Sequence, residues 1–428
     1  MNFQNTLAFA QQLDREDALA PFRKAFVIPQ HQGKEAIYFL GNSLGLRPKQ
    51  TTAYLNQIMQ QWDQYGVEGF FMGDEPWMHY HDTLVQPLSK IVGALPHEIV
   101  VMNSLTVNLH LMLVSFYQPK DKRNKILCEA KAFCSDQYML ETHVRQRGLD
   151  PEEVIIEVHP REGESLIRHE DILAAIEQHK EELALVFFGG VNYYTGQVLN
   201  MQDIARVAHQ IGAVIGFDLA HAAGNITMDL HDWNADFACW CSYKYLNSSP
   251  GAIGGVFIHE KHHRDPLLDR FAGWWGYNKA TRFKMQKGFD PIASAEGWQL
   301  STPSPMLYAA HKAALEIFEK AGMPSLEKKG KLLSDYLLFL LKEINATLKT
   351  PMIRVLTPAA AKGCQVSMLM LQNGKEIFDH LSGEGVFADW REPDVIRIAP
   401  VPLYNSFEDV WQFGKILKEA CTKFTDSI

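Results

Sequence analysis

The sequence predicts an α/β protein in which a mostly parallel, doubly wound sheet carries helices on both faces. Between residues 154 and 217, apolar strand-like runs alternate with segments of helical periodicity, which is the order expected of strand–helix–strand units. Polar residues gather where these strands end. Open α/β sheets bind ligands at that edge. Beyond about residue 305 the alternation continues as a second, smaller α/β unit.

Length and composition are those of a soluble globular protein, with 428 residues, of which 46% are hydrophobic and 21% charged. The formal net charge of −9 argues against nucleic acid or an anionic membrane as the main partner. No apolar run approaches the roughly 18 residues that span a bilayer. The first six residues lack a basic region followed by an apolar one, so no secretory signal is expected. We therefore expect a cytoplasmic protein.

The six cysteines show no paired C-x-x-C spacing of the kind that binds zinc. Cys239 and Cys241 stand two apart on an expected strand, so their side chains point to the same side. Buried free thiols are the expectation. We predict no structural metal and no disulfide.

Three parts are expected along the chain: an N-terminal helix and arm over 1–30, a large domain over 31–305, and a small domain over 306–428. The expected strands cover 37–40, 99–102, 125–128, 154–158, 183–188, 213–217, 237–240, a stretch ending near 258, 365–371 and 395–398. The expected helices cover 7–13, 103–113, a segment opening at 132–138, 171–179, 201–211, 309–318, 325–344, 376–381 and 406–420. Ser406 and Asp409 form an expected capping pair at the start of the last helix.

Near the N-terminus, the short strand at 37–40 leads into Gly41–Gly45, where two glycines enclose a polar pair. Such a turn lets the backbone approach a ligand closely. An ordinary connecting turn without a ligand is an equally good interpretation. Aromatic residues crowd the stretch from 62 to 80. It is interpreted as a wall for an aromatic substrate, with core packing or a dimer surface as the alternatives.

The helix expected from 103 follows a strand directly, with Asn103 or Ser104 as its N-cap. Free N–H groups and the positive end of the helix dipole can hold an anion there, although many helices begin this way without one. The helix opening at 132–138 follows the next strand. In it, Phe133 is placed to stack on a flat ring, and Asp136 is either a cap or a second acid beside that ring.

An acid and a lysine follow two neighbouring strands. Asp218 comes directly after the strand at 213–217, and Lys244 follows the strand at 237–240. Pyridoxal phosphate (PLP) enzymes need this pair, because the lysine forms a Schiff base with the cofactor and the acid partners its pyridinium nitrogen. Solvated loop residues are the alternative interpretation. After Lys244, Gly273–Gly276 and Thr281–Met285 stand on an expected long loop, and long ordered loops in enzymes often build sites.

Taken together, these stretches resemble the kynureninases, PLP enzymes of fold type I that are related to the class V aminotransferases and cysteine desulfurases. The matching stretches, in chain order, are Gly41–Gly45, Leu105–His110, Tyr194–Gln197, Asp218–His221, Cys241–Asn247, Gly273–Gly276, Thr281–Met285 and Arg397–Phe407.

The resemblance implies PLP as the cofactor and assigns residues around its ring. Lys244 would form the Schiff base and Asp218 would pair with the pyridinium nitrogen. Phe133 would lie over the ring, with Asp136 and His221 beside it. The implied reaction is hydrolysis of L-kynurenine to anthranilate and L-alanine, in tryptophan catabolism or NAD biosynthesis. In that reaction Lys244 would remove the substrate α-proton.

Further residues would bind the phosphate and the substrate. Leu105 and Thr106 would hold the phosphate at the helix start, with the hydroxyl of Tyr243 added. Tyr243 is also the candidate acid and base for the later steps. Ser43 would contact the substrate. Arg397 would clamp its carboxylate, a bidentate task that suits a guanidinium group; a surface charge at a strand end is the alternative.

A homodimer with shared active sites is also implied, because Trp274 and Thr302 would reach in from the other subunit. Two positions where animal relatives are expected to carry histidine hold Val67 and Tyr277 here, and Ser301 precedes Thr302 where an asparagine is expected. These positions bear on the 3-hydroxyl of the substrate ring. Kynurenine is therefore expected to be favoured over 3-hydroxykynurenine.

Two other functions are compatible with the same fold. A cysteine desulfurase or selenocysteine lyase would need a reactive cysteine on a flexible loop, and Cys364 at a loop-to-strand position is the candidate. A non-catalytic binding protein that kept the PLP fold is the second alternative.

Overall fold

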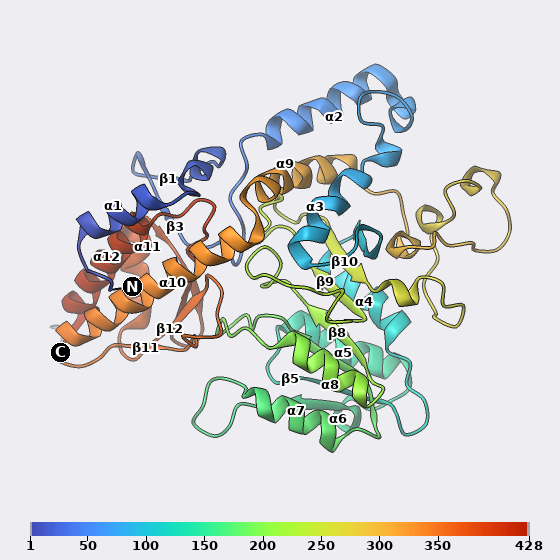
Figure 1. Cartoon of the computed structure of the whole chain (residues 1–428). Helices are drawn as coiled ribbons and strands as arrows, with labels where there is room; N and C mark the ends of the chain where they lie inside the picture. The colour runs from blue at the N-terminus through green and yellow to red at the C-terminus, as the bar shows by residue number, and fades with distance from the viewer. Residues whose placement is uncertain (1, 426–428) are drawn as a thin grey trace.

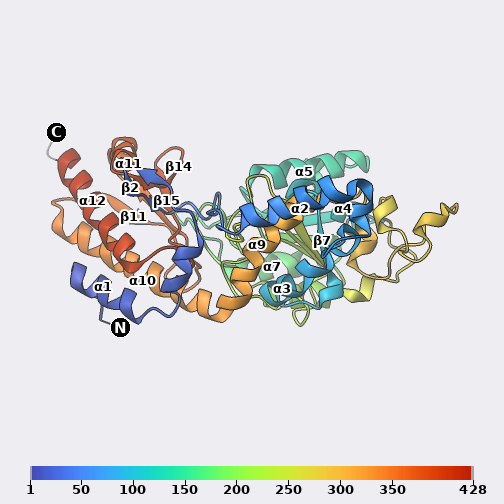
Figure 2. The ribbon, with the colours of Figure 1, turned by 90° about the horizontal axis from the view of Figure 1, so that it is seen from above.

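The computed structural model describes residues 2–425. Met1, the first residue of the expected N-terminal arm, and residues 426–428, the last of the expected small domain, lie outside the described residues. The molecule has two lobes joined side by side (Figures 1 and 2). A seven-stranded sheet forms the larger lobe, and a four-stranded sheet forms the smaller one. Within residues 2–425, no helix combines the length and the apolar character that crossing a bilayer requires.

The large sheet has the strand order β4-β10-β9-β8-β7-β5-β6. Strands β6, β5, β7, β8 and β9 run parallel, and β10 is antiparallel to both of its neighbours. The mostly parallel sheet predicted from the sequence is therefore confirmed. Its strands are β4 (Ile99–Met102), β5 (Lys125–Glu129), β6 (Ile155–Val158), β7 (Leu183–Gly189), β8 (Val214–Asp218), β9 (Phe237–Trp240) and β10 (Gly254–Ile258).

Helices cover both faces of this sheet, as predicted. Along β7, Leu185 and Phe187 belong to one apolar core, whereas Val186 and Phe188 belong to another, because successive side chains of a strand point to opposite faces. The first core contains α4 (Leu105–Phe116), α5 (Cys134–Gln146) and the short α6 (Pro151–Val154). The second contains α2 (Thr51–Tyr65), α3 (Asp82–Val92), α7 (His169–Gln178), α8 (Met201–Gln210) and α9 (Pro305–Ala321).

The smaller lobe is an antiparallel sheet with the order β11-β12-β15-β14, covered by helices from both ends of the chain (Figure 1). Its N-terminal helix α1 contributes Ala10 and Leu13 to the apolar core of this lobe. The elements are α1 (Leu7–Glu16), α10 (Met323–Thr347), β11 (Ile353–Val355), β12 (Val366–Met370), α11 (Gly374–Gly383), β14 (Asp389–Arg391), β15 (Val395–Ile398) and α12 (Phe407–Thr425).

The predicted cap of α12 is confirmed, because the N–H of Asp409 donates to Ser406 Oγ at 3.0 Å and the N–H of Ser406 donates to Asp409 Oδ2 at 3.1 Å. The strand expected over 37–40 is shorter, and pairs with a two-residue strand outside the large sheet. The residues from 259 to 304 carry only short 3₁₀ turns, as expected of a long loop. The remaining short strands are β1 (Gln30–His31), β2 (Lys34–Glu35), β3 (Ile37–Tyr38) and β13 (Val386–Phe387).

Candidate active site

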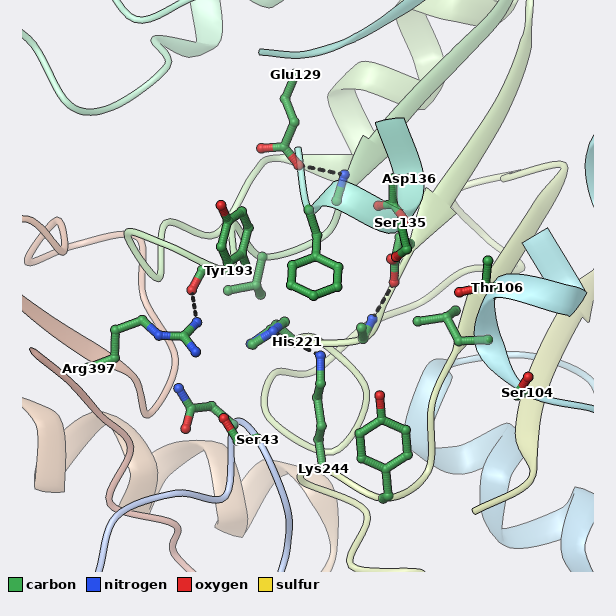
Figure 3. Close-up of a pocket in the computed structure, with 18 of the residues that line it drawn as sticks. Ser43, Ser104, Thr106, Glu129, Ser135, Asp136, Tyr193, His221, Lys244 and Arg397 are labelled. Carbon is green, nitrogen blue, oxygen red and sulfur yellow. Dashed lines mark hydrogen bonds between the residues drawn. The ribbon is translucent and has the colours of Figure 1, made fainter. Parts of the chain in front are cut away.

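A cavity of about 350 Å³ opens at the carboxyl ends of β5, β7 and β8, and residues of both lobes line it (Figure 3). It brings together most of the side chains singled out from the sequence. Those residues are Ser43, Leu105, Thr106, Phe133, Asp136, Asp218, His221, Tyr243, Lys244 and Arg397. Trp274 and Thr302 do not line this cavity.

Lys244 points into the cavity from the loop after β9 (Figure 3). Its Nζ lies 3.0 Å from Nε2 of His221 and 6.0 Å from the centre of the Phe133 ring. Burial, and then the charge of Lys244, hold the pKa of His221 well below its ordinary value. The imidazole is therefore neutral at physiological pH and accepts the hydrogen bond from the lysine.

The predicted turn at Gly41–Gly45 packs directly on the Lys244 loop. The N–H of Gly45 donates to the carbonyl of Tyr243 at 2.7 Å. A Cβ atom at position 45 would lie 2.3 Å from the carbonyl oxygen of Lys244, so only glycine allows this approach. The turn also brings Ser43 to the cavity wall. The close backbone approach expected from the glycines thus occurs toward the lysine loop.

Two carboxyl groups meet on the opposite side of the cavity. Asp218 is the last residue of β8, and Asp136 lies in the first turn of α5. Burial raises the pKa of each, and their mutual hydrogen bond and charge raise that of Asp136 further. The N–H of Ala220 donates to Asp218 Oδ1 at 2.7 Å, whereas Asp136 Oδ1 is buried without a partner. Such an unsatisfied acceptor is available to a donor on a bound group.

Helix α4 presents its first turn to the same cavity. Ser104 occupies the N-cap position, as predicted, but its side chain makes no capping hydrogen bond. The N–H groups of Leu105 and Thr106 therefore have no partner within the helix. Together with the positive end of the helix dipole, they can hold an anion. Gly254 lies close by, where a Cβ atom would lie 3.4 Å from the Leu105 nitrogen.

Arg397 reaches the cavity from β15 of the smaller lobe, directly opposite Asp389 on β14. Its Nε donates to Asp389 Oδ2 at 2.6 Å, Nη2 donates to the same oxygen, and Nη1 donates to the Tyr193 carbonyl. A guanidinium group has five N–H donors, so one hydrogen remains on each Nη. Asp389 also accepts from Arg391 Nε at 2.9 Å, and this leaves the group of three side chains with one net positive charge.

Several residues at the cavity were not singled out from the sequence. Glu129 is the last residue of β5, and the rule that ligands bind at the carboxyl ends of strands could have found it. Tyr193 follows β7, in a segment that the sequence places at that strand end without giving it a role. Arg391 and its partner Asp389 belong to β14, a strand that the sequence analysis missed because three residues are too short to show alternation.

The cysteine considered for desulfurase chemistry lies in an unreactive place. Cys364 is buried, and burial raises the pKa of its thiol to about 12. Its N–H is held by Asn225 Oδ1 at 2.9 Å. The thiolate is the nucleophilic form of cysteine, so this residue lacks both the charge and the mobility of a desulfurase nucleophile.

Comparison with known proteins decides between the candidate functions. The aminotransferase class-V family matches residues 37–362, and the kynureninase C-terminal domain matches residues 326–417. The kynureninase of Flavobacterium psychrophilum is 54% identical over 421 residues, which are 98% of this chain and 99% of that one. This chain belongs to the kynureninase family. The kynureninase of Myxococcus xanthus is 48% identical over 97% of each chain.

Solved structures of other proteins have the same fold as this member of the kynureninase family. The cysteine desulfurase of Thermococcus onnurineus aligns with a TM-score of 0.72 and 17% identity, over 91% of this chain and 95% of that one. The cysteine desulfurase CsdA of Escherichia coli aligns with a TM-score of 0.73 and 16% identity, over 95% and 98%. At such identities the likeness concerns the fold alone, which is fold type I.

The enzyme uses PLP as its cofactor, as its family does. The cavity fits this group in three ways: Phe133, which lines it, is 41% exposed, the carboxyl group of Asp218 lies at the cavity wall, and the first N–H groups of α4 are free. Those features match the flat ring, the ring nitrogen and the phosphate of PLP.

Proposed function

We propose that the enzyme hydrolyses the Cβ–Cγ bond of L-kynurenine to give anthranilate and L-alanine, and that the residues of the cavity have the roles expected from the sequence. The observation that carries this proposal is the meeting of Lys244 from the larger lobe with Arg397 from the smaller lobe around one cavity. One is a base placed for an α-proton, and the other is a cation placed for an α-carboxylate.

In this proposal the larger lobe holds the cofactor. Lys244 attaches it, Phe133 stacks on its ring, and Asp218 pairs with its ring nitrogen, with Asp136 and His221 beside the ring. Leu105 and Thr106 hold the phosphate through the start of α4, with the Tyr243 hydroxyl beside them. Bound PLP supplies a sink for the electrons left at the substrate α-carbon when its proton departs.

Proton movement is assigned to Lys244 and Tyr243. Lys244 takes the α-proton, and neutral His221 orients its Nζ by accepting a hydrogen bond at 3.0 Å. Burial raises the pKa of the Tyr243 hydroxyl above its ordinary value, so the group remains protonated at neutral pH. It can then donate a proton in the later steps, when water has added to the γ-carbonyl and the Cβ–Cγ bond breaks.

The substrate carboxylate is assigned to Arg397, with Ser43 beside it. Asp389 and the Tyr193 carbonyl use three of the five donors of Arg397. The free hydrogens on Nη1 and Nη2 can bind two carboxylate oxygens at once. Neither Val67 nor Thr302 lines the cavity, so the preference for kynurenine over 3-hydroxykynurenine stays a prediction from the sequence.

The reaction and the substrate preference can be tested with the purified enzyme supplied with PLP. Kynurenine and 3-hydroxykynurenine are added separately and the aromatic product is followed. Visible absorbance of the bound cofactor with release of anthranilate is expected, at a higher rate than 3-hydroxyanthranilate. If the cofactor binds and neither substrate is cleaved, the proposed reaction is wrong while the cofactor site stands.

We also propose that the enzyme works as a homodimer with shared sites. Trp274 lies outside the cavity on the long loop, 42% exposed, and contacts Phe283, which contacts Phe71. Large exposed apolar patches of this kind mark protein interfaces. Thr302 is exposed near the end of the same loop. A cytoplasmic location belongs to the same proposal, supported by the free thiols of Cys128, Cys134, Cys239, Cys241 and Cys364.

Complementation tests the shared sites. Lys244→Ala and Trp274→Ala are each expected to be inactive. Mixed after reversible dissociation, they should recover about a quarter of the wild-type activity, which is the statistical share of intact sites for random pairing in a two-fold dimer. A sedimentation measurement that finds a monomer, or a mixture without recovery, would contradict the dimer proposal.

A further inference from the structure

We infer that Glu129 is a positioning residue, which sets the orientation of Arg397 through the turn formed by Asn192–Gly196. This inference rests on the proposed role of Arg397 as the clamp for the substrate carboxylate. Glu129 is the last residue of β5 and lines the cavity (Figure 3). Glu129 is 5% exposed, and it has no part in the proposed binding of cofactor or substrate.

Both carboxylate oxygens of Glu129 accept hydrogen bonds from the strand end opposite. Oε1 accepts from the N–H of Gly189 at 3.1 Å, and Oε2 accepts from Asn192 Nδ2 at 2.8 Å. A Cβ atom at position 189 would lie 2.6 Å from Oε1. The glycine therefore makes room for this carboxylate, and the carboxylate holds the first residue of the turn.

Asn192 in turn orders the backbone that follows it. Its Oδ1 accepts from the N–H of Tyr194 at 3.0 Å, from the N–H of Thr195 at 2.9 Å and from Thr195 Oγ1 at 3.0 Å. With Oδ1 committed to the turn, Nδ2 must face Glu129. The side-chain amide thus links the carboxylate on β5 to the backbone conformation of the turn.

The turn is where the smaller lobe docks. Three successive carbonyl groups accept side-chain donors of that lobe, and the first of them also accepts from Arg397 Nη1. The other donors are Gln365 Nε2 to Tyr193 at 2.9 Å, Ser367 Oγ to Tyr194 at 2.6 Å and Thr357 Oγ1 to Thr195 at 2.5 Å. A continuous series of contacts therefore runs from Glu129 through Asn192 and Tyr193 to the guanidinium group.

The charge of Glu129 matters because both of its partners are donors. Burial raises the pKa of this carboxyl to about 7, against the lowering effect of its two hydrogen bonds, and the charge of Asp218 raises it further. Asp136, Cys128 and Tyr193 are the other titratable groups that face it. Above pH 7 the ionised group accepts both hydrogen bonds. Below pH 7 the carboxyl group is protonated and its O–H opposes one of the two N–H donors. One hydrogen bond to the turn is then lost.

The test uses the holoenzyme and two probes that differ only at the carboxylate: L-alanine, the amino-acid product of the proposed reaction, and L-alaninamide. Binding is followed through the visible absorbance of the bound cofactor. Glu129→Gln places a donor against Gly189 or Asn192. It is expected to weaken L-alanine binding at pH 8 by about tenfold, the scale of one charge-assisted hydrogen bond, and to leave L-alaninamide binding unchanged.

Controls separate positioning from folding and from cofactor binding. Glu157→Gln makes the same chemical change on the exposed face of the neighbouring strand β6 and should have no effect. Asn192→Ala removes the side chain that links Glu129 to the turn. It should weaken L-alanine binding as much as Glu129→Gln does. As the pH drops through 7, the affinity of the wild type for L-alanine should fall to the affinity of Glu129→Gln. The affinity of Glu129→Gln should show no such fall near pH 7.

The outcomes distinguish this inference from the proposed function. If Arg397→Lys does not weaken L-alanine binding, the proposed clamp is wrong. If Arg397→Lys weakens it while Glu129→Gln and Asn192→Ala bind L-alanine as the wild type does, the positioning role is wrong. Equal weakening of both probes by Glu129→Gln would also overturn it, because the residue would then act on the cofactor.

Discussion

Lys244 Nζ lies 3.0 Å from Nε2 of His221, although 22 residues separate these two in the chain, because the loops that carry them follow the adjacent parallel strands β8 and β9. The lysine therefore faces a neutral imidazole that is fixed by burial. This hydrogen bond holds the amino group at one point of the cavity.

Replacing Lys244 with alanine should abolish both turnover and the visible absorbance of bound PLP, since the residue both attaches the cofactor and accepts the α-proton. Activity and absorbance spectra measure the two effects. Lys180→Ala, exposed in the turn after α7, is the matched control and should behave as the wild type. Retention of both properties in Lys244→Ala would exclude the assignment.

Arg397→Lys should raise KM for kynurenine by about 100-fold, with a smaller change in kcat. Lysine keeps the charge but cannot bind a carboxylate through two donors, and truncating a buried, hydrogen-bonded charge pair costs about 2–5 kcal/mol. Steady-state kinetics measure the split. Arg354→Lys, exposed on β11 of the same sheet, should leave KM unchanged. An unchanged KM in Arg397→Lys would contradict the clamp.

Asp389→Asn should raise KM by about tenfold and leave cofactor absorbance intact. The carboxylate accepts from Arg391 and from two nitrogens of Arg397. An amide has one acceptor oxygen and adds a donor, so the guanidinium group would lose its fixed direction, at the cost of about one charge-assisted hydrogen bond. If the kinetics of Asp389→Asn match the wild type, the direction of Arg397 is set by the Tyr193 carbonyl alone.

Cys364→Ala should retain kynurenine hydrolysis within about twofold. The thiol is buried with a pKa of about 12, and the expected effect is a loss of about 1 kcal/mol of stability from the vacated volume. Thermal unfolding and product assays check the two parts. Release of sulfide from cysteine by the wild type, lost in the variant, would instead revive the desulfurase alternative.

Asp236→Asn should destabilise the larger lobe by about 3 kcal/mol without changing the active cavity. Burial alone would raise the pKa of Asp236, but hydrogen bonds from His209 and His262 and the charge of Lys261 lower it far below 3.8. A lowered pKa means that this stabilisation is present above pH 3.8 and is lost as the pH falls below it. Unfolding curves of wild type and variant should therefore differ at pH 7 and approach each other in acid.

By itself, the sequence determined the elements of the large sheet and the chemistry at its edge. Residues such as Asp218 and Lys244 could be found because they follow strands directly, and the carboxyl ends of parallel strands meet at one edge. The capping pair Ser406 and Asp409 was likewise visible, because its residues interact across a single helical turn. Local periodicity and short spacing carry that information.

Only the tertiary structure decided what joins the two lobes. Strand β14 was missed, and with it the place of Asp389 opposite Arg397. The linkage of Glu129 to Asn192 crosses from one strand end to another that is 63 residues away in the chain. Contacts of this kind depend on how complete elements pack against one another, and no local pattern in the chain records which side chains will then meet.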